Sequence, residues 1–189
     1  NLESVYHRLY FGNEFCEKLL PSESDLTYAI DFAKRNGMKF TFVTSWVTDA
    51  GLERLEKLFR TLKEHGGEET VVNDYGVLTL TREVGLKPVV GRLLTKQYRC
   101  IDKAKIEERA STLRRYNSLN RYVIGFLQKY GEGRVEFDNV PQGTEIIPLL
   151  RNHFKISIYL PYVYVSTTRL CFSSTNTRNE SGLKITGCS

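Results

Sequence analysis

The sequence predicts an α/β fold, an incomplete (β/α) barrel of the TIM type. Short apolar segments rich in β-branched residues alternate with longer segments in which apolar residues recur at helical spacing. This alternation is typical of parallel strands joined by right-handed helical crossovers. No Gly-x-Gly-x-x-Gly motif follows the first strand, which argues against a dinucleotide-binding sheet.

The expected strands are runs of β-branched and aromatic residues that end in turn residues. The first run ends at Gly12, and the run over residues 69–72 ends at Asn73 and Asp74. Several runs are apolar throughout, which indicates strands covered on both faces. Strands are expected at residues 5–11, 39–45, 69–72, 87–93, 134–137, 155–160 and 162–167.

Helix boundaries are indicated by capping residues. Residues 21–25 carry helix-start signals, Thr48 caps the second helix, and glycines at 37, 66 and 85 follow helix ends. Helices are expected at about 25–36, 49–65, 75–83, 106–129 and 145–152.

Polar residues occur where the expected strands end. In a barrel of parallel strands these positions meet at one mouth, where the chemistry of such folds takes place. Seven strands are expected where a closed barrel has eight. We therefore expect at least one strand to be missing at the termini, so that residues 1–189 form a single domain of a longer chain. The mouth residues are Asn13, Glu14, Thr44, Ser45, Asn73, Asp74, Arg92, Glu136, Asp138, Thr167 and Arg169.

Composition restricts the classes of function. The net charge of +5 is modest, and basic residues are interspersed with acidic ones along the helices. One basic aromatic face could be a solvated helix surface or could contact a small anion or an RNA. No apolar run approaches the roughly 20 residues that cross a bilayer, and no secretory signal is visible, so we expect a cytoplasmic protein without a membrane segment. The basic aromatic face comprises Arg109, Arg114, Arg115, Tyr116, Arg121 and Tyr122.

The cysteines suggest a metal site. Cys16 and Cys171 each follow the end of a strand, and Cys188 lies on the continuation from Cys171, so all three thiols can reach one mouth. Three such thiols suit a soft metal or an iron–sulfur cluster, although inert buried cysteines have the same pattern. Cys100 lies in a polar stretch and is not assigned to this metal site.

Other catalytic patterns are absent from the sequence. His7, His65 and His153 lack the i, i+4 partner of a zinc helix, so we expect structural roles for them. There is no Gly-x-Ser-x-Gly elbow, and the residues alone give no support for a hydrolase.

Four segments resemble the peptidase U-32 family, and within it the branch that contains the anaerobic ubiquinone-biosynthesis hydroxylation proteins. The likeness covers nearly the whole chain in order. The segments are Leu9–Cys16, Thr70–Gly76, Val90–Leu94 and Tyr159–Ser166.

The resemblance implies a modified β/α barrel that holds a [4Fe-4S] cluster on four cysteines. Cys16, Cys171 and Cys188 match three of the ligands, and the fourth would not be in this chain; zinc is the less favoured metal. The implied function is oxygen-independent hydroxylation, either as the enzyme or as an accessory protein. The alternatives are a U-32-type peptidase or collagenase, and a non-catalytic barrel subunit that binds a partner chain.

The remaining site residues are assigned to substrate. Asp74 and Arg92 are expected to be catalytic, with Arg92 pairing to a carboxylate; a salt bridge between these two residues is the alternative. Asn73, Glu136 and Arg169 are expected to contact a small anionic substrate or an RNA base. A heterodimer with a related chain is a further expectation.

Overall fold

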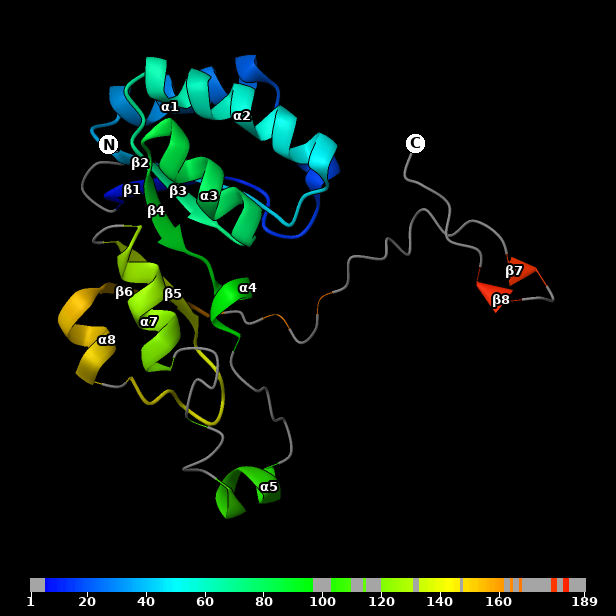
Figure 1. Ribbon diagram of the computed structural model, residues 1–189, viewed down its shortest axis with the longest axis vertical. Coiled ribbons are helices and arrows are strands. Elements are labelled where there is room, and N and C mark those ends of the chain that lie inside the picture. Colours follow the sequence, from blue (N-terminus) through cyan, green and yellow to red (C-terminus); the bar gives the residue numbers. More distant parts are fainter. Residues whose placement is uncertain are drawn as a thin grey trace.

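The computed structural model has six parallel strands in a curled sheet with helices between them, an incomplete (β/α) barrel as predicted (Figure 1). The strands follow one another in the sheet in the order of the sequence, from β1 to β6. The structure describes residues 6–96, 103–109, 114, 120–130, 133–146, 148–161, 164, 167, 178–179 and 182–183.

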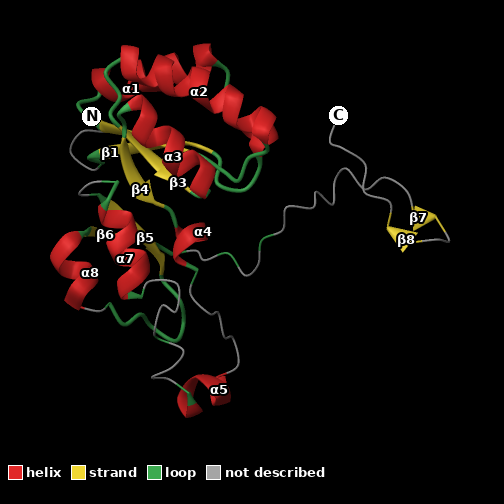
Figure 2. Cartoon of the chain, in the orientation of Figure 1, coloured by secondary structure: helices red, strands yellow, loops and turns green. Residues whose placement is uncertain are grey.

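Within the described residues the barrel strands have the following bounds: β1 Arg8–Gly12, β2 Lys39–Val43, β3 Glu69–Val72, β4 Lys87–Val90, β5 Arg134–Asp138 and β6 Lys155–Tyr159. A separate antiparallel ribbon consists of β7 Arg178–Asn179 and β8 Gly182–Leu183. The helices are η2 Glu17–Leu19, α1 Glu23–Arg35, α2 Asp49–Glu64, α3 Tyr75–Val84, α4 Arg92–Thr95, α5 Lys103–Glu108, α7 Arg121–Gln128 and α8 Pro148–His153 (Figure 2).

The first three long helices begin at side-chain caps. Ser22 and Asp25 form a reciprocal capping box at the start of α1, and the Thr48 hydroxyl accepts a hydrogen bond from the Gly51 amide at the start of α2. At the end of α3, Gly85 adopts the left-handed conformation with φ of 77°. These helices lie side by side along the outer face of the early strands (Figure 1).

The two faces of the sheet differ in chemistry because side chains alternate along each strand. Outward-facing side chains are apolar: Phe42 of β2 packs edge-to-face on Phe59 of α2, with ring centroids 6.2 Å apart. Both rings are fully buried in the main core. The inward face combines charged and hydroxyl side chains with a small buried cluster of Val43, Val71 and Val89, so it is only in part the branched aliphatic interior usual for TIM barrels.

An ionic network forms the floor of this interior, at the amino ends of the strands. Oε1 of Glu69 lies 2.6 Å from guanidinium nitrogens of both Arg8 and Arg134. Thr41 donates its hydroxyl proton to the same carboxylate oxygen. One carboxylate therefore ties β1, β2, β3 and β5 together across the inside of the curled sheet.

Three predicted elements need comment. The helix expected over residues 106–129 is wrong: α5 ends at Glu108, and Asn120 caps a new helix, α7, with an extended backbone. The strand expected over 87–93 ends at Val90, because Gly91 caps α4. The strand expected at 162–167 lies outside the described residues except for Tyr164 and Thr167.

None of the helices in the described part of the chain has the length and apolar character that crossing a membrane requires.

We predict that Gly12→Ala destabilises the protein by at least about 2 kcal/mol, measured by urea unfolding. Gly12 ends β1 with φ of 133°, and a Cβ built there would lie 2.1 Å from the Val43 carbonyl oxygen. Neither the backbone angle nor the paired strand can accommodate the methyl group.

Gly125→Ala is the matched control. Gly125 lies inside α7, and a Cβ there meets nothing within 4 Å. Alanine should stabilise this helix by about 0.5–1 kcal/mol. Equal effects of the two substitutions would contradict the conformation described for Gly12.

Candidate functional site

The candidate site is built around Arg92, the first residue of α4, immediately after β4. Asn73 positions this turn: its Oδ1 accepts the Leu93 amide at 3.2 Å, and its Nδ2 donates to the Thr44 carbonyl at 2.8 Å. A Cβ at Gly91 would lie 2.2 Å from Asn73 Oδ1. Glycine at 91 therefore permits the close approach that fixes the start of α4.

The Arg92 guanidinium is buried between two carboxylates, one on the loop after β1 and the other at the end of β5. Its Nε lies 3.0 Å from Glu14 Oε1, its Nη2 lies 2.5 Å from Glu14 Oε2, and its Nη1 lies 2.8 Å from Asp138 Oδ1. Burial alone would lower the pKa of Arg92, but the bonds and charges of Glu14 and Asp138 outweigh it and raise the pKa above its ordinary value. Loops after β1 and β4 and the end of β5 are thus held together.

Aromatic rings surround the same guanidinium. The Arg92 carbon Cζ lies 4.0 Å from the Tyr159 ring centroid, 5.2 Å from that of Tyr164 and 5.8 Å from that of Phe15. Phe15 and Tyr164 also meet edge-to-face at 5.5 Å. Cation–π attraction adds to the ion pairs and packs the segment after β6 against the loop after β1.

Glu136 lies deeper in the interior, on β5, with no exposed surface. Its Oε2 accepts the Tyr159 hydroxyl at 3.1 Å, whereas Oε1 has no hydrogen-bond partner among the described residues. The pKa of Glu136 is raised to about 7, chiefly by burial and in part by the charge of Glu14. The hydrogen bond from Tyr159 and the charge of Arg134 act in the opposite direction, with less effect.

Cys16 lies on the loop that also supplies Glu14 and Phe15. Asn13 orders this loop, since its Oδ1 accepts the amides of both Phe15 and Cys16 at 2.8 Å. Cys16 is a free, half-buried thiol at the cap of η2. Among the described residues no three His, Cys, Asp or Glu side chains form a group that could hold a metal ion.

The other predicted site residues have different surroundings. The Asp74 carboxylate caps α3 by accepting the Gly76 amide at 2.8 Å, while Arg92 pairs with Glu14 and Asp138. Asn73 is fully buried and uses both ends of its amide in the fold. Arg169, Cys171 and Cys188 lie outside the described residues.

Tyr159 and Phe15 were not assigned to the site from the sequence. Strand alternation could have found Tyr159, because it lies two and four residues after inward-facing positions of β6. Phe15 belongs to a loop, and no periodicity predicts where a loop side chain points.

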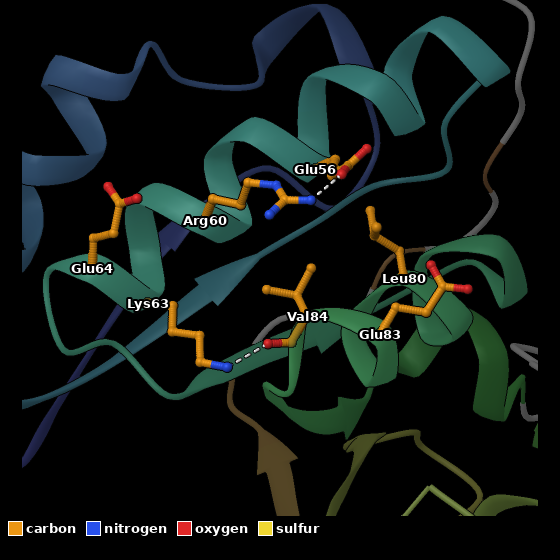
Figure 3. A pocket seen from close by; sticks show the side chains of 7 residues that line it. All are labelled: Glu56, Arg60, Lys63, Glu64, Leu80, Glu83 and Val84. Carbon is orange, nitrogen blue, oxygen red and sulfur yellow. Dashed lines mark hydrogen bonds and ion pairs between the residues drawn. The ribbon is translucent and has the colours of Figure 1, made fainter.

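Two surface hollows lie away from this site. One, of about 400 Å³, runs between α2 and α3, where Arg60 pairs with Glu56 and Lys63 donates to the Val84 carbonyl (Figure 3). The other, of about 390 Å³, lies at the amino ends of β1 to β4. Neither is lined by a residue of the Arg92 cluster.

Comparison with known proteins adds little. No family model matches the sequence, and no curated protein matches it either. Among solved structures, a crystal structure of D-psicose 3-epimerase in the presence of D-fructose is similar, with a TM-score of 0.37 and 13% identity over 78% of this chain and 73% of that one. Likeness at this level bears on neither substrate nor mechanism.

We predict that Glu136→Gln flattens the pH dependence of stability. Below about pH 4.5 the carboxyl is mostly protonated in both the folded and the unfolded chain, so no free energy of unfolding is lost through its ionisation. Between that pH and about 7 the unfolded chain ionises first, so the wild type loses stability as pH rises. Above pH 7 the free energy of unfolding of the wild type is lower by roughly 3 kcal/mol because of this raised pKa.

Urea unfolding of both proteins from pH 4 to pH 8.5 measures this difference. Glu68→Gln is the control, because the Glu68 carboxylate is exposed and its pair with Lys87 is screened by solvent. A constant offset between wild type and Glu136→Gln at every pH would show that Glu136 does not titrate in this range.

Proposed function

We propose that this chain is the cluster-carrying barrel of an oxygen-independent hydroxylation system, as its resemblance to the U-32 family implies. The observation that carries the proposal is the position of Cys16. Its thiol stands two residues after Glu14, the carboxylate that clamps Arg92. A cysteine-bound cofactor would therefore adjoin the ionic and aromatic cluster at the mouth of the barrel.

The surroundings of Cys16 suit a ligand of an iron–sulfur cluster. It is free and half-buried, and its loop is already ordered by Asn13, so binding would require little rearrangement of that loop. Cys171 and Cys188 would supply further thiolates, and a fourth ligand would come from outside this chain. A [4Fe-4S] cluster, when bound, supplies one-electron redox chemistry.

The cluster around Arg92 favours one of the two expected substrate classes. The charge of Arg92 is already balanced by Glu14 and Asp138, so an anionic substrate would have to displace one of them. A neutral ring such as an RNA base could instead stack on Phe15, which is 40% exposed. We favour the neutral ring, with Arg92 as the residue that holds the mouth together.

The remaining expectations belong to this proposal. Oxygen-sensitive clusters suit a reducing compartment, which is consistent with a cytoplasmic protein. A related partner chain could supply the fourth ligand.

We predict that protein purified without oxygen contains iron and sulfide and has a broad absorption band near about 400 nm from thiolate-bound iron. Cys16→Ser should lose most of the band and iron, because one thiolate is removed. Cys100→Ser is the matched control and should retain both. Iron content that is equal in the two variants, or a colourless wild type, would contradict the proposal.

A further inference from the structure

The buried carboxyl of Glu136 is not accounted for by the ionic cluster. Arg92 pairs with Glu14 and Asp138, and among the described residues no ion pair of Glu136 is found. Glu136 has no exposed surface, and its Oε1 is buried without a hydrogen-bond partner among the described residues. An acid in this state lowers the stability of the fold. Its presence in the core therefore suggests a function.

The hydrogen bond between this carboxyl and Tyr159 leads toward the mouth. Tyr159 is the last residue of β6, and its hydroxyl donates a hydrogen bond to Glu136 Oε2 at 3.1 Å. Its ring centroid lies 4.0 Å from Cζ of Arg92. Tyr159 is only partly buried. The tyrosine therefore connects the interior acid to the residues around which a substrate would bind.

We propose that Glu136 accepts and returns a proton for the reaction at the mouth, and that the proton passes through the Tyr159 hydroxyl. The reaction is that of the proposed function, so this assignment rests on it. In the step, the Tyr159 oxygen takes the proton released by the substrate while its own O–H bond breaks. The original hydroxyl proton of Tyr159 then forms a new O–H bond on Glu136, so Tyr159 stays neutral and the carboxylate becomes a neutral acid.

The surroundings are consistent with an acid that can carry a proton near neutral pH. The pKa of Glu136 is raised to about 7, mainly by burial and also by the charge of Glu14, against the lowering effects of Tyr159, Arg134 and Tyr10. Burial and the neighbouring Glu136 charge also raise the pKa of Tyr159, so its hydroxyl keeps a proton to pass on. A proton carrier should have a pKa near the working pH.

Tyr10 provides a rival route. It lies on β1, is 38% exposed, and stands beside Glu136 and Ser157 across the interior. Its hydroxyl could pass the proton directly to bulk water and bypass the mouth. The geometry favours Tyr159: its hydroxyl lies 3.1 Å from Glu136 Oε2. A hydrogen bond from Tyr10 also lowers the pKa of Glu136, but with less effect than the bond from Tyr159.

Infrared spectroscopy can distinguish the two routes without a substrate or a cluster. The C=O band of protonated Glu136 is assigned at about pH 5.5, below the pKa, as the band missing from Glu136→Gln. After dilution into D₂O, the shift of this band gives the rate of proton exchange. The rate is compared among wild type, Tyr159→Phe and the matched variant Tyr10→Phe.

We expect Tyr159→Phe to slow exchange by about tenfold or more, because it removes the hydroxyl that donates to the carboxyl. Tyr10→Phe should leave the rate within about twofold. Exchange that is unchanged in Tyr159→Phe, or slowed only in Tyr10→Phe, would overturn the proposal. Absence of a band assignable to Glu136 would also overturn it.

A measurement on the wild type alone does not depend on whether the variants fold correctly. The carboxyl should exchange faster than the amides of Val135 and Phe137, which flank it on β5 and exchange only when the strand opens. Equal rates would mean that the proton escapes by local unfolding, and the relay would be wrong. Because these measurements do not involve iron, they can fail while the cluster assay succeeds, or the reverse.

Discussion

The ion pairs of Arg92 are the interaction on which the carboxyl end of this barrel depends. Arg92 is only 8% exposed, so its charge needs to be balanced, and Glu14 on the loop after β1 and Asp138 at the end of β5 do so. Removing one partner of such a group leaves the others buried and uncompensated, at a cost of about 3–5 kcal/mol. The loop that carries Cys16 is therefore held in place by an electrostatic constraint.

The polar interior follows from the incomplete sheet. Six curled strands do not enclose the layers of branched side chains that fill an eight-stranded barrel. Ionic and hydroxyl groups share the interior with a small valine cluster on β2, β3 and β4, the Glu69 network lying at the amino ends and the Arg92 cluster at the carboxyl ends. Glu136 lies between these two layers, and this is why its carboxyl is both buried and linked to the mouth.

The fold could be predicted from the sequence because strand and helix patterns are local. The order of six strands, and the convergence of Glu14, Arg92 and Asp138, followed from parallel topology. The break between α5 and α7 did not, because apolar spacing continues through residues that do not form one helix. The roles of Asn73 and Asp74 depend on backbone groups, which a sequence does not reveal.

The most direct test of this account is a double-mutant cycle between Arg92 and Glu14, using Arg92→Ala, Glu14→Ala and the double variant. Urea unfolding should give a coupling free energy of at least about 1.5 kcal/mol, as for buried charge pairs in contact. The exposed pair Arg60 and Glu56 on α2 provides a control cycle, with a coupling close to zero. Equally small coupling in both cycles would show that Arg92 does not hold the Cys16 loop.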